Sequence, residues 1–175
     1  MSLLNLESVE NAEGQVVDIY NQIQQMFGSV PDGFLLHAIS PELLKNNWEN
    51  HTYYLQHSAL SSPLLALIRM LVSRDNACDY CIDLNAAMLI NTGQFTHEQI
   101  DAIKVDPANA PISEKDKAML LFVLKATQDA KSVTGEDVQL LRDLGWSDRD
   151  IYDATAHGAR NIAMDVIFNT FKIEY

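Results

Sequence analysis

Residues 72–87 read VSRDNACDYCIDLNAA, and this stretch contains both cysteines of the 175-residue chain. Cys78 and Cys81 precede an apolar run with helical spacing, so the pattern predicts a dithiol at the start of a helix. Unpaired backbone N–H groups and the positive end of the helix dipole favour a thiolate there. Because residues i and i+3 share a helix face, the two sulfurs can form a disulfide across one turn. Redox chemistry is therefore the leading functional hypothesis.

Helix start signals recur on both sides of this stretch. Ser40-Pro41 and Ser62-Pro63 each place a capping residue before a proline suited to the first helical position. Other starts are indicated by a serine or threonine followed by early acids. These lie at Thr96, Ser113, Thr134 and Ser147. Glycines after periodic stretches indicate helix ends, at Gly28, Gly93 and Gly145.

These signals predict an all-α bundle of about eight helices and no strand. We expect the helices at residues 12–27, 41–58, 63–76, 78–92, 97–104, 114–130, 135–144 and 148–171. Residues 28–34 read as a turn. The last helix is rich in apolar residues and is expected to lie at the centre of the bundle or at a subunit interface. Its apolar members are Ile151, Ala154, Ala156, Ile162, Ala163, Val166, Ile167 and Phe171.

Size and composition narrow the class of protein. A chain of 175 residues, 47% of them hydrophobic, predicts a single domain over residues 1–175 with a sizeable core. The net charge of −12 disfavours nucleic acid and anionic membranes as partners. The N-terminal residues lack the features of a signal peptide, and no apolar run has the length of a membrane span. We expect a cytoplasmic protein.

Two other classes of Cys-x-x-Cys protein fit the sequence less well. A zinc site would need further ligands at suitable spacing, and the five histidines are scattered along the chain. A thioredoxin fold would need a strand before the dithiol, whereas residues 63–72 read as a capped helix. We therefore expect no bound metal and no bound cofactor. Cysteines are also among the most buried residues, so an inert core pair is the plain structural alternative.

The dithiol and its context resemble the AhpD-like, carboxymuconolactone decarboxylase family. The likeness is closest to the branch labelled peroxidase-related, which shares the string Val-Ser-Arg-x-Asn-x-Cys-x-Tyr-Cys at residues 72–81 and a Ser-Asp-x-x-Ile start to the final helix at residues 147–151. This resemblance implies an all-α oligomer, a dimer, trimer or hexamer, that reduces peroxides with its two cysteines. It also implies an external dithiol reductant, such as a lipoylated or thioredoxin-like protein.

The resemblance carries over to only some of the family's functional residues. Cys78 and Cys81 match the family's dithiol, and Tyr80 between them is the usual neighbour. The family's histidine, four residues after the second cysteine, and its glutamate, about twelve before the first, are replaced here by Asn85 and Ala66. Asparagine can form hydrogen bonds but carries no proton, and alanine does neither. The proton relay expected of the family is thus missing from its usual positions.

The two cysteines can be assigned roles in two ways. The resemblance implies that Cys81 attacks the peroxide and that Cys78 resolves the sulfenic acid, whereas helix-terminus electrostatics favour Cys78 as the thiolate. Arg74 would support a thiolate, and neighbouring acids would oppose it. These acids are Asp75, Asp79 and Asp83.

Asn85 and His157 are further candidates. Asn85 lies one turn beyond Cys81, and it is either a site residue or a polar helix residue. His157 in the final helix could replace the missing acid–base residue, although a core or interface histidine is the simpler interpretation.

Three functions remain open from the sequence. The first is a thiol-dependent alkyl hydroperoxidase or disulfide oxidoreductase of AhpD type, with peroxide as substrate. The second is a redox-sensing or binding relative that keeps the scaffold and the dithiol without efficient turnover. The third and weakest is decarboxylase-type lyase chemistry on a lactone, which the resemblance implies because some cysteine-free relatives perform it. The retained dithiol counts against this third function.

Overall fold

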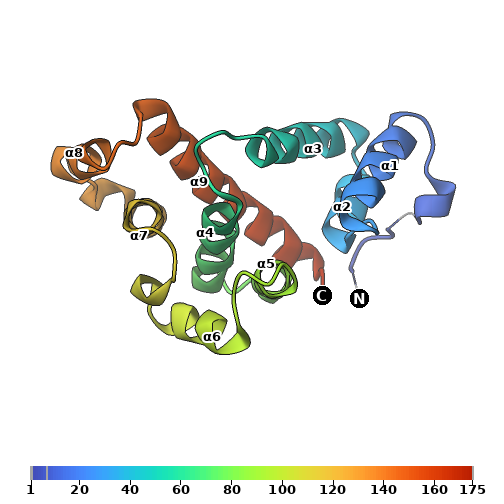
Figure 1. The fold of residues 1–175 in the computed structure, drawn as a ribbon. Coiled ribbons are helices and arrows are strands. Elements are labelled where there is room, and N and C mark those ends of the chain that lie inside the picture. Colours follow the sequence, from blue (N-terminus) through green and yellow to red (C-terminus); the bar gives the residue numbers. More distant parts are fainter. Residues whose placement is uncertain (1, 7, 175) are drawn as a thin grey trace. The chain divides into compact units, whose positions relative to one another are not determined.

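The chain is all-α, as the sequence predicts. The computed structural model describes residues 2–6 and 8–174, and in these ranges it contains no strand. The described ranges contain nine α-helices, which are labelled in Figure 1. They are α1 (Gln15–Phe27), α2 (Asp32–His37), α3 (Pro41–Leu55), α4 (Ser62–Asp75), α5 (Asp79–Asn91), α6 (His97–Val105), α7 (Glu114–Gln128), α8 (Gly135–Asp143) and α9 (Asp148–Phe171). Three short 3-10 helices lie at Val9–Asn11, Pro107–Asn109 and Ala130–Ser132.

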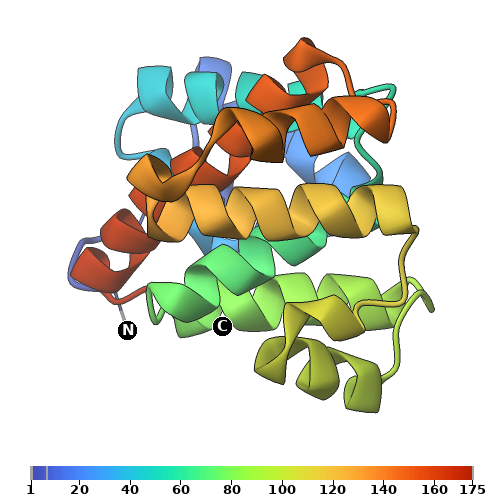
Figure 2. The ribbon, with the colours of Figure 1, turned by 90° about the vertical axis from the view of Figure 1, so that its left-hand side faces the viewer.

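The helices form two compact units. The first contains the described residues up to Gln56 and those from Phe168 onward, and the second runs from His57 to Ile167. In the first, α1, α2 and α3 pack around an apolar core. In the second, α4 packs against both α5 and α7. In Figure 2 the ribbon is turned so that α7 and α6 of the second unit face the viewer. That the whole chain unfolds as one domain stays a prediction.

The capping signals locate most helix starts correctly. Thr96 and Thr134 form reciprocal capping boxes with Gln99 and Asp137. Ser147 and Asp150 exchange the same pair of bonds: the Ser147 N–H donates to Asp150 Oδ2 and the Asp150 N–H donates to Ser147 Oγ, at 3.1 and 3.2 Å. These side chains satisfy backbone N–H groups that lack partners in the first turn of a helix.

The prediction for the start of α4 is wrong by one residue. Its cap is Ser61, whose Oγ accepts the Leu64 N–H, so Ser62 is already helical and Pro63 follows within the first turn. Two adjacent serines before a proline offer the same local signal, and a bond from Ser61 to Asp116 of α7, Oγ to Oδ2 at 2.9 Å, favours the first of them. The start at Ser40-Pro41 is confirmed, although Ser40 makes no side-chain capping bond.

Helix α2 is absent from the sequence prediction. The sequence predicts a turn over residues 28–34, whereas the chain bends at Gly28, at φ 81°, and Ser29, and Asp32 already begins α2. With six residues, α2 spans fewer than two turns and therefore shows no usable hydrophobic period. It packs on α3, and this tertiary contact stabilises a helix too short to be stable alone.

The apolar description of α9 also needs correction. Val166 is 59% exposed and Ala163 is exposed, while four polar residues spaced by four positions are buried. We call these four the polar stripe of α9: Asp153, His157, Asn161 and Asp165. One line of the buried face is thus polar over three turns, beside buried apolar residues such as Ile151, Ala154 and Phe168. None of the helices in the described ranges is long and apolar enough to span a membrane.

Candidate dithiol site

A tight turn between α4 and α5 positions the dithiol. The Ala77 N–H donates to the Arg74 carbonyl and the Cys78 N–H to the Ser73 carbonyl, at 3.2 and 3.0 Å. This is a Schellman motif, which ends α4 and requires a left-handed residue in the middle. Ala77 takes that conformation at φ 52°. Cys78 follows immediately as the cap residue of α5 and Cys81 lies in the first turn, as predicted.

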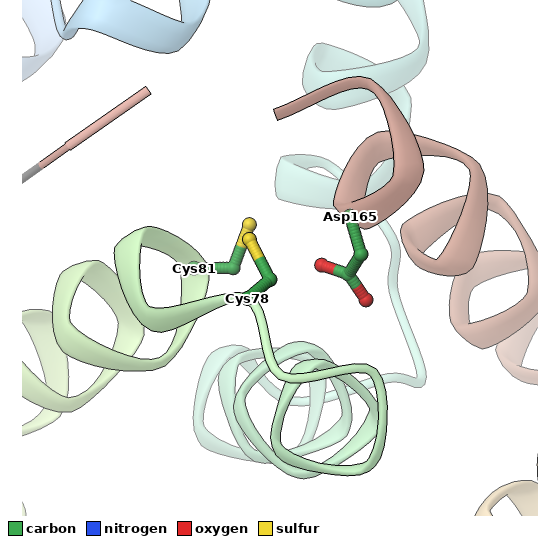
Figure 3. Close-up of side chains that lie close together, drawn as sticks. All are labelled: Cys78, Cys81 and Asp165. Carbon is green, nitrogen blue, oxygen red and sulfur yellow. The ribbon is translucent and has the colours of Figure 1, made fainter. Parts of the chain in front are cut away.

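Both cysteines are reduced and buried. Cys78 is 1% exposed and Cys81 is 5% exposed. Their two Sγ atoms and a carboxylate oxygen of Asp165 all lie within 4.8 Å of one another. Figure 3 shows the sulfurs close together at the start of α5 and the Asp165 carboxyl group reaching them from α9. Among the described residues, this is the one cluster of three side chains able to ligate a metal.

Three polar side chains hold the Asp165 carboxyl group. Ser73 Oγ donates to Oδ1 at 2.7 Å and Asn76 Nδ2 donates to Oδ2 at 3.2 Å. Asn161 Nδ2 lies 3.3 Å from both oxygens and also donates to Ser73 Oγ at 2.7 Å. With Asp165 fully buried, these bonds fix the carboxyl group in place beside the dithiol.

The electrostatics of the cluster favour one negative charge shared between the sulfurs. A hydrogen bond from the Cys81 thiol lowers the pKa of Cys78, and the same bond, together with burial, raises the pKa of Cys81. Burial also raises the pKa of Asp165, although its hydrogen bonds with Ser73 and the thiols oppose this. Like charges repel at short range, so Cys78, Cys81 and Asp165 do not all carry a negative charge at once. In the resting protein, at least one proton stays on Asp165 or on a sulfur.

A second polar group lies behind the dithiol. Arg69 Nε donates to Asn85 Oδ1 at 2.7 Å, and Asn85 Nδ2 donates to the Cys81 carbonyl at 2.7 Å. Arg69 Nη1 lies 3.2 Å from His157 Nε2, which in turn lies 3.3 Å from the Leu65 carbonyl. An arginine only donates, so the bond from Arg69 needs the His157 tautomer whose Nε2 carries no hydrogen and accepts. The Leu65 carbonyl is also an acceptor, so in this tautomer it contacts Nε2 without a hydrogen bond. Burial lowers the pKa of Arg69 to about 10, and the charge of Cys81 opposes this.

The other residues selected from the sequence lie in different settings. Asn85 and Tyr80 are buried on α5, and Ala66 is buried on α4. Arg74 binds the Asp75 carboxylate at 2.8 Å and the Lys104 carbonyl at 2.8 Å. Asp79 and Asp83 are exposed, so solvent screens their effect on the thiols.

Sequence reasoning missed Asp165 and Arg69. Asp165 is far from the dithiol in the chain, and only the packing of α9 on α4 brings it there. Its signal was the four-residue spacing of the polar stripe, which places four polar side chains on one face of the helix. Arg69 is the one charged residue in the apolar part of α4 and could have been identified in the same way.

Comparison with solved structures shows what fold this is. An uncharacterized peroxidase-related protein with an alkylhydroperoxidase AhpD core, from Ralstonia eutropha JMP134, superposes with a TM-score of 0.87 at 24% identity over 99% of this chain and 91% of that chain. An uncharacterized peroxidase-related protein from Silicibacter sp. TM1040 gives 0.86 at 21% identity over the same shares, 99% and 91%. The chain therefore has the AhpD-type fold that residues 72–87 predict.

A more distant likeness agrees. A protein of unknown function from Agrobacterium tumefaciens, provisionally named an antioxidant defence protein AhpD, gives a TM-score of 0.66 at 23% identity over 78% of this chain and 92% of that chain. A search of protein-family profiles and of curated proteins found no match for this chain.

Proposed function

We propose that this protein is a thiol-dependent peroxidase or disulfide oxidoreductase of the AhpD type. The observation that supports it best is the group formed by Cys78, Cys81 and Asp165, whose reactive atoms lie within 4.8 Å of one another. A dithiol supplies the two electrons that a peroxide needs, and an adjacent carboxyl group supplies the proton. Asp165 thereby takes the place of the family's histidine and glutamate, which Asn85 and Ala66 replace.

In the first step, a thiolate attacks the terminal oxygen of an alkyl hydroperoxide. A sulfur–oxygen bond forms, the oxygen–oxygen bond breaks, and two electrons pass from sulfur to oxygen. The leaving alkoxide takes the proton of Asp165 and becomes an alcohol. The raised pKa of Asp165 favours the protonated form that this step needs.

In the second step, the remaining thiol passes its proton to the Asp165 carboxylate and attacks the sulfenic sulfur. The disulfide forms, the sulfur–oxygen bond breaks, and the departing hydroxide takes the proton from Asp165 to become water. An external protein dithiol then returns two electrons and two protons. The partners proposed are thus a peroxide and a dithiol reductant, in the cytoplasm.

The two assignments of the cysteines predict different intermediates. The family resemblance assigns the attack to Cys81, whereas the hydrogen bond that lowers the pKa of Cys78 favours Cys78. If Cys81 attacks, Cys78→Ser stalls at a sulfenic acid and Cys81→Ser does not react. If Cys78 attacks, the two results are exchanged.

The test is the rate of thiol loss after one equivalent of peroxide is added to the reduced protein. We expect second-order loss much faster than that of a free thiol, and Asp165→Asn should slow it at least about 100-fold, the usual contribution of a general acid. Asp153→Asn is the matched control, since Asp153 belongs to the polar stripe but pairs with His57 at 3.3 Å. Loss at the free-thiol rate in the unmodified protein would contradict a peroxidase.

A second candidate function is a slow redox sensor or binding protein. The burial of both sulfurs favours it, because reactive thiols are usually partly exposed and lie near positive charge. For this function, thiol loss proceeds at an ordinary rate but still ends in the Cys78–Cys81 disulfide. A change in partner binding on oxidation, with no catalytic turnover, would distinguish it from the peroxidase.

We further propose that the protein is a homo-oligomer. Large apolar side chains are exposed on several helices, among them Leu43, Leu140, Tyr152 and Val166. Light scattering coupled to size exclusion would give the number of subunits. A monomer across the accessible concentration range would contradict this proposal.

A further inference from the structure

The same three side chains have the chemistry of a metal site. The two sulfurs come from the start of α5 and the carboxylate from α9 (Figure 3). Two thiolates and one carboxylate are ligands that Zn²⁺ accepts in its tetrahedral sites, with a fourth position left for water. From sequence spacing the dithiol offers only two ligands, and the fold adds the third.

The carboxylate is oriented as metal-ligating carboxylates usually are. Ser73 and Asn76 each donate to a different oxygen of Asp165, and Asn161 lies 3.3 Å from both oxygens. Outer partners of this kind fix a ligand in position and typically change metal affinity by about 10–100-fold when removed. All three ligands are buried, so a bound cation would be shielded from bulk solvent apart from the water in its fourth position.

We propose that the reduced protein binds one borderline-soft divalent cation, with Zn²⁺ as the type case, through Cys78, Cys81 and Asp165. Hard cations do not fit, because Mg²⁺ and Ca²⁺ take about six or more oxygen ligands and this cluster offers one carboxylate. Binding uses the lone pairs that would otherwise attack a peroxide or form the disulfide. Metal binding and oxidation therefore exclude each other, and oxidation releases the ion. This inference does not require that the protein turn over peroxide.

The test is a titration of the reduced full-length protein with Co²⁺, whose visible spectrum reports tetrahedral thiolate coordination. We expect one Co²⁺ per chain, displaced by Zn²⁺ and unaffected by excess Mg²⁺. Cys78→Ser and Cys81→Ser should abolish the thiolate bands. Asp165→Asn should weaken binding at least about tenfold, and Ser73→Ala by about tenfold through loss of the carboxylate's partner.

Two controls keep the proposal falsifiable. Asp153→Asn removes a carboxylate of the polar stripe that pairs with His57, and it should bind Co²⁺ as the unmodified protein does. Asp165→Glu keeps a carboxylate and should retain more affinity than Asp165→Asn, with the helical circular dichroism of each variant checking its fold. Equal affinity in Asp165→Asn and the unmodified protein, or no thiolate spectrum at all, would overturn the three-ligand site.

A second measurement separates this inference from the peroxidase. One equivalent of Zn²⁺ should protect both thiols from peroxide, and the oxidised protein should show no Co²⁺ spectrum. If thiol loss is slow even with a chelator present but Co²⁺ still binds, the peroxidase fails and the metal site stands. If thiol loss is fast and Zn²⁺ has no effect on it, the metal site fails and the peroxidase stands.

Discussion

The two units of this chain bury ring and polar side chains in different ways. In the first unit, His51 lies among aromatic rings, stacked on Trp48 with centroids 5.6 Å apart and edge-on to Phe27 and Phe34. In the second unit, His157 lies beside a guanidinium and a backbone carbonyl. The first arrangement depends on ring shape and apolar area, and the second on directional bonds.

This difference indicates where chemistry takes place. Aromatic packing stabilises a fold at little cost in desolvation, because few polar groups lose water. A stripe of four buried polar residues costs free energy unless each is hydrogen-bonded, so the folded protein keeps it only with matching partners. The partners of His157, Asn161 and Asp165 lie on α4 and at its end: Arg69, Ser73 and Asn76. Asp153 pairs with His57, which precedes α4. The second unit is therefore where we expect mutations to change reactivity as well as stability.

The largest effect on stability should come from the aromatic core. Trp48→Ala removes a 5% exposed indole that packs on three rings and donates to Gln22 Oε1 at 2.8 Å. We expect the free energy of unfolding to fall by about 3–5 kcal/mol, the usual range for a buried aromatic residue. Denaturant unfolding measures it, and the thiol oxidation rate of the folded variant should not change.

Leu43→Ala on the same helix is the control, because Leu43 is 57% exposed and should be nearly neutral. Since the sequence predicts a single domain, Trp48→Ala should shift one cooperative transition. A separate early transition confined to the first unit would contradict the single domain.

The next effect concerns the pH dependence of stability. The folded pKa of Asp165 is raised, so above about pH 3.9, the usual value for aspartate, the folded protein holds its proton more tightly than the unfolded chain does. The contribution of Asp165 to stability therefore falls as pH rises toward the folded pKa, by up to about 1.4 kcal/mol per pH unit.

Asp165→Asn should remove this dependence. At low pH the variant should be less stable by roughly 1–3 kcal/mol, because buried donors lose an acceptor, and the deficit should shrink as pH rises. Denaturant unfolding of both proteins across the pH range measures the difference in their free energies of unfolding. The contributions of the other carboxyl groups are common to both proteins and cancel in this difference. A deficit that grows with pH would show that the folded pKa of Asp165 is lowered.

A smaller effect should come from the glycine next to His157. A Cβ at Gly158 would lie 2.6 Å from Val123 Cγ1 of α7 and 3.5 Å from Ile68 Cγ2 of α4. Gly158→Ala should lower the free energy of unfolding by about 1–2 kcal/mol, since the end of the Val123 side chain can shift to relieve part of the overlap.

The same substitution should disturb the polar stripe. The added methyl group should displace α9 and lengthen the hydrogen bonds that Asn161 and Asp165 form with Ser73 of α4. Asp165 would then be less well placed beside the dithiol, so oxidation of the dithiol should slow as well. The double variant Gly158→Ala, Val123→Ala should recover the oxidation rate by making room for the methyl group. No recovery would mean that the close approach of α9 does not position Asp165.

The smallest effect should be a gain in stability at the turn before the dithiol. Ala77 occupies the left-handed position of the Schellman motif, where glycine has no steric cost. Ala77→Gly should therefore raise the free energy of unfolding by up to about 1 kcal/mol. Ala118→Gly within α7 is the matched control and should lower it by about 1 kcal/mol. A loss of stability in both variants would contradict the strain assigned to Ala77.

Local patterns in the sequence determined most of the fold. Caps, terminal glycines and hydrophobic period depend on neighbours a few residues away, so they predicted eight of the helices and the dithiol at the start of α5. The same reasoning missed α2, because six residues show no period, and it counted the apolar residues of α9 without noticing the polar ones between them.

Only the tertiary structure decided what surrounds the dithiol. Asp165 reaches the sulfurs through the packing of α9 on α4, and the close approach at Gly158 and the bonds from Ser73 and Asn76 fix that register. No local signal reports such a contact, since it depends on which faces of distant helices meet. The sequence by itself determined that a dithiol begins a helix of an all-α protein, and the three-dimensional packing decided that a buried carboxyl group lies beside it.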